Sequence, residues 1–440
     1  MSRLEIGLWS FPVLLLLIFL RIPIGLAMFI VGIGGSYVLN GTTLMTFAQL
    51  KHMTYGTFSS YSLSIIPLFL LMGQFATIGG MSSSLFRASE AWLGHKKGGV
   101  AMSAVGACAG FGAICGSSLA TAATMGQVAL PELRKYGYSG ALSTGALAAG
   151  GTLGILIPPS VILVIYAILT EQNIAKLFAA AFIPGILAAI SYMIAIYIYA
   201  SITGDTGKTR ERVPYLERFK VLLTIWPVLA IFTAVIGGIY TGWFTPTEAA
   251  AIGAAGTALV ALANRSLTIK SLVQAIFSTA TSTGMIFTII LGAGLFNAFL
   301  ATTQLPQELS TYIATQGFSP WLVLTIVLLL YLVFGCVMDS LSMVLLTVPI
   351  FFPIMSGLDF GMPAADFGLW FGILVLIVVE VGLITPPVGM NLFVINALAK
   401  NVSIAETFKG VIPFVTADLV RVVILVFFPS ITLSLVWLLY

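Results

Sequence analysis

The chain has 440 residues, of which 59% are hydrophobic and only 8% charged, and its mean hydropathy is +1.09. Because soluble proteins carry about 25% charged residues, this composition predicts an integral membrane protein in a lipid bilayer and excludes an ordinary soluble enzyme. The net charge of +4 gives no reason to expect a nucleic-acid partner, and the three cysteines have neither disulfide-framework nor zinc-site spacing.

Apolar runs fill nearly the whole chain and leave no stretch long enough for a soluble domain. A helix that spans a membrane needs about 20 apolar residues. The first run continues past Arg21 into a second one without a cleavage site of the A-x-A type, so we expect no removed signal peptide. The predicted runs lie at about 6–20, 22–39, 60–79, 98–131, 140–170, 177–203, 220–241, 247–263, 273–300, 320–355, 367–399 and 411–439.

Two of these runs, 98–131 and 320–355, are too long for one crossing. Each is interrupted near its middle by small and polar residues, GAICGSSLATAATMG in the first and GCVMDSLSM in the second. Two spans are possible for each run, but then these low-charge stretches would lie in solvent-exposed loops. We therefore predict two re-entrant helical hairpins whose tips reach the interior of the membrane.

Charge around the runs predicts their orientation, because Lys and Arg accumulate in short cytoplasmic loops. The flanks of the first hairpin are basic, whereas the flanks of the second contain acids and no Lys or Arg. The first hairpin is therefore expected to begin and end inside, and the second outside. The segment 40–59 is expected to be an external loop. The charged flanking residues are Arg87, Lys96, Lys97, Arg134 and Lys135 for the first hairpin, and Glu308, Asp359 and Asp366 for the second.

The basic stretch 204–220 is the most hydrophilic part of the chain and is predicted to be a cytoplasmic linker. It separates residues 1–203 from residues 221–440, which contain similar motifs in the same order. Similar halves with opposite predicted orientation are typical of the inverted repeats of secondary transporters. The predicted fold is an all-α polytopic membrane protein with two inverted-topology repeats.

Each predicted repeat contains a Pro-Pro pair inside an apolar run, in GILIPPS within 140–170 and in GLITPPV within 367–399. Proline lacks the amide donor of a helix, so each pair predicts a broken helix with freed carbonyl groups. Such backbone is tolerated at membrane depth only where protein or a watery cavity surrounds it, and carbonyl oxygens can bind a hard cation. The following half-helix begins with free amides that suit an anion. A simple proline kink is the alternative.

The hairpin tips are the second candidate feature. Gly112 and Gly116 predict an unwound first tip at which hydroxyl groups face a cation and a substrate, although small residues also serve close helix packing. In the second tip Asp339 is an acid at membrane depth, where burial is costly and ionisable groups are functional candidates. Asp339 is expected either to bind a cation or to accept hydrogen bonds from the tip backbone.

Other polar residues in the runs are weaker candidates. Glu380 is placed to relay a proton or to accept a hydrogen bond from a nearby hydroxyl, and Asp418 is expected to pair with Arg421 on one helix face. His52 and His95 fall in predicted loops and form no metal site. Walker A and hydrolase motifs do not occur in the sequence, so we expect neither ATP hydrolysis nor enzymatic activity.

The two hairpins, the early RIPIGLA, the segment IPLFLLMGQFATIGGMSSSLF and the breaks GILIPPS and GLITPPVGMN resemble the large membrane subunit (M subunit, DctM-like) of TRAP (tripartite ATP-independent periplasmic) transporters. The resemblance covers essentially the whole chain. It implies an elevator-type, sodium-coupled importer of a small organic anion, such as a C4-dicarboxylate, in the bacterial inner membrane. It also implies two partners, a separate small four-span membrane subunit and a periplasmic substrate-binding protein, and no cofactor apart from Na+ as coupling ion.

The resemblance further implies two sodium sites and a substrate site between the tips. The first sodium site would use Ser117, Gly154, Ile157 and Pro158. The second would use Gly335, Asp339, Gly382, Thr385 and Val388. Substrate contacts are expected from Ser118, Thr121, Ser160 and Asn391. A receptor-independent dicarboxylate or citrate carrier, an anion exporter and a passive ion channel are the alternative functions.

Overall fold

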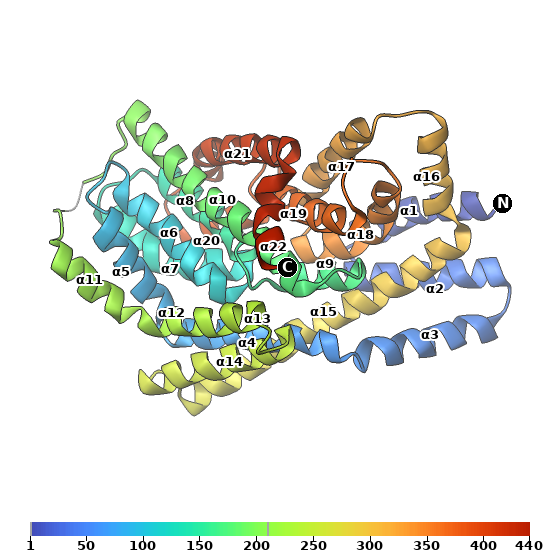
Figure 1. Cartoon of the computed structure of the whole chain (residues 1–440), viewed down its shortest axis with the longest axis horizontal. Coiled ribbons are helices and arrows are strands. Elements are labelled where there is room, and N and C mark those ends of the chain that lie inside the picture. The colour runs from blue at the N-terminus through green and yellow to red at the C-terminus, as the bar shows by residue number, and fades with distance from the viewer. Residues whose placement is uncertain (1, 209–210) are drawn as a thin grey trace.

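A computed structural model describes residues 2–208 and 211–440 of the chain, and within these ranges all regular elements are helical (Figure 1). In chain order the elements are α1 (Arg3–Phe19), α2 (Ile24–Asn40), α3 (Thr43–Phe58), η1 (Tyr61–Ser64), α4 (Ile65–Ile78), α5 (Met81–Leu93), α6 (Gly99–Cys115), α7 (Ser118–Lys135), α8 (Gly140–Leu156), α9 (Val161–Leu169), α10 (Ile174–Thr203), α11 (Tyr215–Thr224), α12 (Trp226–Phe232), η2 (Thr233–Gly237), α13 (Gly238–Tyr240), α14 (Pro246–Ala263), α15 (Ile269–Thr303), α16 (Leu305–Thr315), α17 (Pro320–Gly335), α18 (Ser340–Ser356), α19 (Ala364–Leu383), α20 (Met390–Leu398), α21 (Ile404–Phe427) and α22 (Pro429–Leu439).

Helices that could span a membrane confirm the polytopic prediction. Among the described residues, 6 helices are long and apolar enough to cross a bilayer, or up to 8 if each of two bent helix pairs is one span. One bent pair is α8 with α9, which meet at 46° across the first Pro-Pro break, and the other lies at the start of the second half and bends by 57°. The predicted all-α membrane fold is therefore confirmed.

Both predicted hairpins and both predicted breaks are present. The helices α6 and α7 form the first hairpin and α17 and α18 the second, and in each pair the two helices contact each other along the hairpin. Helix α8 ends at Leu156 and α9 begins at Val161, whereas α19 ends at Leu383 and α20 begins at Met390. The chain therefore loses its helical conformation at both Pro-Pro pairs, because neither proline can donate to the preceding turn.

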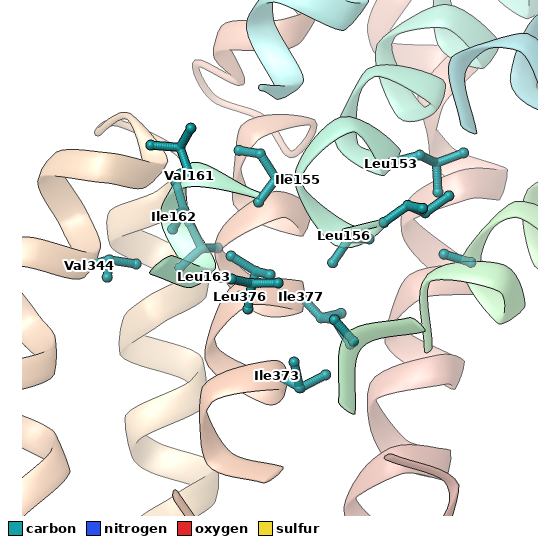
Figure 2. Packing of buried hydrophobic residues seen from close by; sticks show 14 of the residues in the cluster. Leu153, Ile155, Leu156, Val161, Ile162, Leu163, Val344, Ile373, Leu376 and Ile377 are labelled. Atoms are coloured by element: carbon teal, nitrogen blue, oxygen red, sulfur yellow. The ribbon is translucent and has the colours of Figure 1, made fainter. Parts of the chain in front are cut away.

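In each half, the short helix that follows the Pro-Pro break packs against helices of the other half. After the first break, α9 packs against α18 and α19 of the second half, and after the second break, α20 packs against α7 and α8 of the first half. Figure 2 shows the first of these contacts, with Leu163 of α9 close to Leu376 of α19. Both side chains are almost completely buried. The first break is thus enclosed by protein, as non-helical backbone at membrane depth requires, whereas Pro386 and Pro387 of the second break are exposed.

A second group of helices, which comprises α2, α4, α14 and α15, packs beside the hairpins and the breaks. The long helix α15 runs diagonally beside α2 and reaches α4, and α14 packs along α4 (Figure 1). Glycines allow the close approach of α2 and α15: a Cβ atom on Gly292 would lie 2.1 Å from the carbonyl oxygen of Gly25. Small residues at helix contacts are the usual way in which membrane helices pack closely.

Two local predictions were wrong. The predicted external loop 40–59 contains α3, so His52 lies in a helix, and the polar residues of that helix concealed its periodicity. The predicted run 411–439 is two helices, because Pro429 begins α22 and α21 ends before it. The predicted linker 204–220 becomes helical from Tyr215 onward, and its residues 209 and 210 lie outside the described residues.

Candidate functional site

The first hairpin tip is a two-residue turn between α6 and α7. Gly116 has a φ of +64°, a left-handed conformation that favours glycine, and Ser117 is extended. The Ser117 hydroxyl accepts a hydrogen bond from the Ala120 amide at 3.4 Å and so caps α7. The predicted unwinding at Gly116 is confirmed, but Gly112 remains helical, which corrects the prediction that Gly112 helps to unwind the tip.

Gly112 instead allows the tip to touch the first broken helix. A Cβ atom on Gly112 would lie 2.5 Å from the Cα atom of Gly154, and a Cβ atom on Gly154 would lie 2.7 Å from the Ser117 carbonyl oxygen and 2.4 Å from Thr121 Oγ1. The structure therefore brings together Ser117 and Gly154 of the predicted first sodium site. It also places Thr121, a predicted substrate residue, at this same contact.

The first break consists of residues 157–160, with a cis peptide bond between Pro158 and Pro159. A helix would have supplied the amides of residues 158 and 159 to the carbonyls of Gly154 and Ile155, and prolines cannot do so. Ser160 is completely buried, and its hydroxyl caps α9 by accepting a hydrogen bond from the Leu163 amide at 3.4 Å. The break thus presents oxygen atoms that have lost their helical donors beside the first tip.

The second tip meets the second break in a related way. A Cβ atom on Gly382 would lie 2.5 Å from the Cα atom of Gly335, and the Gly389 amide donates a 3.1 Å hydrogen bond to the Cys336 carbonyl. The peptide bond between Pro386 and Pro387 is cis, as in the first break. Both halves therefore close a hairpin tip onto a Pro-Pro break through a contact between two glycines.

Side chains at the second tip already have local partners. Asp339 caps α18 by accepting a 3.0 Å hydrogen bond from the Ser342 amide, which is one of its two predicted roles. The Thr385 hydroxyl donates to the Val381 carbonyl at 2.6 Å, so its oxygen lone pairs remain available. The carbonyl of Gly382 accepts a hydrogen bond from the Thr385 amide at 3.0 Å. Val388 directly precedes Gly389, whose amide donates to Cys336 of the tip.

Glu380 of α19 lies between the two tips. Its carboxyl group accepts a 2.6 Å hydrogen bond from the hydroxyl of Ser340, the first residue of α18, and it also faces the hydroxyl of Ser118, the first residue of α7. Glu380 is 1% exposed, and among the described residues its Oε2 atom has no other hydrogen-bond partner. The predicted hydroxyl partner is confirmed, and the position of Glu380 between the tips is a feature that the sequence does not indicate.

Asn391, a predicted substrate residue, retains a polar atom without a partner. Asn391, in the first turn of α20, donates to the Ala148 carbonyl of α8 at 3.3 Å, but its Oδ1 atom has no hydrogen-bond partner among the described residues. Thr121, another predicted substrate residue, faces the Cys115 thiol, and both residues are completely buried. Since buried polar groups are nearly always hydrogen-bonded, Asn391 Oδ1 indicates a place for a ligand or water.

A buried network of an ion pair and two hydroxyl groups contacts α8, the helix that precedes the first break. Asp418 pairs with Arg421 at 2.7 Å, as predicted. The Tyr192 hydroxyl donates to Asp418 Oδ2 at 2.8 Å and lies 3.0 Å from Thr152 Oγ1 in α8, two residues before Gly154. Sequence reasoning missed Tyr192 and Thr152, because a tyrosine and a threonine in apolar runs give no signal of a shared network.

Comparisons with known proteins agree with this architecture. The family model "Tripartite ATP-independent periplasmic transporter, DctM component" matches residues 11–431. The C4-dicarboxylate TRAP transporter large permease protein DctM of Pseudomonas aeruginosa is 36% identical over 87% of this chain and 87% of its own length. The sialic acid TRAP transporter permease protein SiaT of Haemophilus influenzae is 31% identical over 95% of this chain and 66% of its own length.

A solved structure extends the likeness to the fold. The crystal structure of the YdaH transporter of Alcanivorax borkumensis superposes with a TM-score of 0.63 at 14% identity, covering 88% of this chain and 89% of that one. The matched family consists of membrane transport permeases and not of enzymes. With its family model matched over almost its whole length, the chain belongs to the DctM family of large inner-membrane permease subunits of TRAP transporters.

Proposed function

We propose that this permease imports a small organic anion together with sodium, and that a C4-dicarboxylate or a related carboxylate is the substrate. The observation that supports this proposal most directly is the pair of tip-to-break contacts, each of which brings backbone and hydroxyl oxygens together. Two relatives are named for C4-dicarboxylate and for sialic acid, and both substrates carry a carboxylate group.

Oxygen ligands without a cluster of acids suit sodium. The part of the chain that the structure describes contains no group of three or more His, Cys, Asp or Glu side chains able to hold a metal ion. Hard cations are bound by carbonyl, hydroxyl and carboxylate oxygens, which both contacts offer. The proposed ligands are Ser117, Gly154, Ile157 and Pro158 for one sodium ion, and Gly335, Asp339, Gly382, Thr385 and Val388 for the other.

The substrate would lie between the tips. Helices α7, α9, α18 and α20 all begin at a tip or a break, and helix N-termini favour anions. The proposed contacts are Ser118, Thr121, Ser160 and Asn391. The Glu380 carboxyl group lies between the tips, beside the proposed substrate contacts.

The movement we propose is an elevator motion of a unit built from both repeats, 1–203 and 221–440, with 204–220 as cytoplasmic linker. The short helices α9 and α20 tie both tips and both breaks into one packed body, which suits rigid-body movement around a fixed site. We further propose that a small four-span membrane subunit and a periplasmic substrate-binding protein complete the transporter, as in other members of the family.

Reconstitution tests this proposal. Proteoliposomes would contain the chain and the four-span subunit of the same organism, and uptake of labelled succinate would be followed with and without the substrate-binding protein and an inward sodium gradient. Uptake is expected only when both are present. Uptake without the binding protein would instead support a receptor-independent carrier, and ionic currents in a planar bilayer beyond alternating-access rates would support a channel.

A further inference from the structure

A cluster of aromatic and basic side chains joins α5 to α11, away from the tips and breaks. Arg218 of α11 is only 3% exposed, and its Nε atom donates to the Val213 carbonyl at 2.8 Å. The guanidinium carbon lies 5.8 Å from the ring centre of Trp92 in α5 and 5.0 Å from that of Tyr215. The Arg218 side chain is thus held in place between two aromatic rings.

Three polar atoms of this cluster are buried and have no hydrogen-bond partner among the described residues: Trp92 Nε1, His95 Nδ1 and Arg218 Nη2. The indole and guanidinium groups can only donate hydrogen bonds. The Arg218 guanidinium lies over the Trp92 ring, and donors buried without partners are costly, so the cluster favours an acceptor group beside these two side chains. A phosphate offers several acceptor oxygens, and arginine binds phosphate well.

The electrostatic environment favours an anion at this position. The pKa of His95 is lowered by burial and, after that, by the positive charges of Arg218, Arg212 and Lys96. Three positively charged side chains therefore act on His95. Of the acids nearby, Glu211 and Glu217 of the adjoining segment are exposed, whereas Glu90 of α5 is buried.

The exposed side chains around the cluster indicate that the anion is a lipid headgroup. Helix α11 exposes Leu216, Phe219 and Leu223, which are 71%, 57% and 70% exposed, and Trp226 follows at 64%. A short helix with exposed apolar and aromatic side chains beside basic residues lies characteristically in the headgroup layer of a membrane. Basic pockets at the cytoplasmic surface bind anionic lipid headgroups.

We propose that the junction of α5 and α11 binds the phosphate group of an anionic phospholipid through Trp92, His95 and Arg218, with the acyl chains beside the apolar side chains of α11. The lipid would hold α11, and with it the linker, at the membrane surface. This inference concerns a site outside the proposed transport path and does not depend on the proposed function.

Lipid titration of the delipidated full chain in detergent, followed by native mass spectrometry, tests the proposal. Phosphatidylglycerol is expected to bind at least about fivefold more tightly than phosphatidylethanolamine, as one basic contact at a membrane surface provides. Arg218→Gln should remove that preference. Trp92→Phe should weaken it while keeping the aromatic ring, and it remains informative if Arg218→Gln does not fold. Lys51→Gln, an exposed change in α3, is the matched control and should leave the preference unchanged.

Three outcomes would overturn this site. One is equal binding of the two lipids by the unaltered chain. Another is an unchanged preference in both Trp92→Phe and folded Arg218→Gln. The third is stabilisation of the chain by inorganic phosphate, dependent on Arg218, without any preference for phosphatidylglycerol, which would assign the site to free phosphate and not to a lipid.

Discussion

Gly382→Ala tests the contact between the second tip and the second break. The new Cβ atom would lie 2.5 Å from both the Cα and the carbonyl carbon of Gly335, and 3.0 Å from the Cys336 amide nitrogen. Carbon atoms in good contact are about 3.5–4.0 Å apart, so α17 and α19 must separate by about 1 Å here. All three atoms belong to the backbone, and no side-chain rotation can relieve the overlap.

The expected cost follows from this separation. Overpacking of a well-packed interior costs about 1–3 kcal/mol. If the sodium-bound state needs the tip closed on the break, most of this cost falls on that state. The apparent sodium affinity should then weaken by about 5- to 150-fold, because each 1.4 kcal/mol is about a factor of ten.

A graded series of glycine variants separates this effect from general destabilisation. Gly335→Ala places its Cβ atom 3.1 Å from Gly382 Cα and should have a smaller effect, whereas Gly284→Ala in α15 meets nothing within 4 Å. Gly284→Ala should leave sodium dependence unchanged and gain about 0.5–1 kcal/mol of stability from the helix preference of alanine. Sodium-dependent thermal unfolding of the purified chain measures all three, since a bound ion stabilises the folded state.

The relative loss of sodium stabilisation among the three glycine variants tests this reasoning. Gly382→Ala should weaken sodium stabilisation most and Gly284→Ala not at all. A sodium titration of Gly382→Ala that coincides with that of Gly284→Ala would show that the closed glycine contact is not needed for ion binding. The reasoning would then fail, even if both variants fold.

Further substitutions probe the other contacts. Tyr192→Phe removes the hydroxyl that donates to buried Asp418 and should lower the stability measured by thermal unfolding by about 1–3 kcal/mol. Ser117→Ala and Thr385→Ala should each shift the sodium titration of uptake to higher concentration, and unchanged titrations in both would contradict the assigned ligands. Glu380→Gln keeps an acceptor for the hydroxyl beside it, so it should fold normally yet lose more than about tenfold in uptake rate if the carboxyl group between the tips takes part in transport.

Much of the fold could be predicted because its unusual features violate ordinary membrane-helix rules. A Pro-Pro pair cannot continue a helix, so both breaks were visible in the sequence, and α8 and α19 end within a few residues of them. The small-residue interruptions likewise located both hairpins. Asp418 and Arg421 could be paired from their spacing alone, since residues three apart lie on one helix face.

The contacts that build the site could not be predicted, because they join residues far apart in sequence. Glu380 was recognisable as a buried acid, but only the packing of α19 between the hairpins places it beside Ser118 and Ser340. Gly112 was read as a helix breaker, whereas its actual role is close approach to Gly154. A glycine gives the same sequence signal for both roles, and the difference depends on what lies opposite.

The contacts within each half and those between the halves have different proposed roles, which gives a physical basis for coupling ion binding to substrate binding. The proposed ion sites lie within each half, where a tip closes on its own break, as the Gly335 and Gly382 contact does in the second half. The proposed substrate contacts join the halves: Glu380 reaches Ser118, and Asn391 reaches α8. An ion that closes a tip thereby fixes one wall of the site, which lowers the ordering cost for the anion. Linkage requires the reverse as well, so a bound anion should raise the affinity for sodium by the same factor.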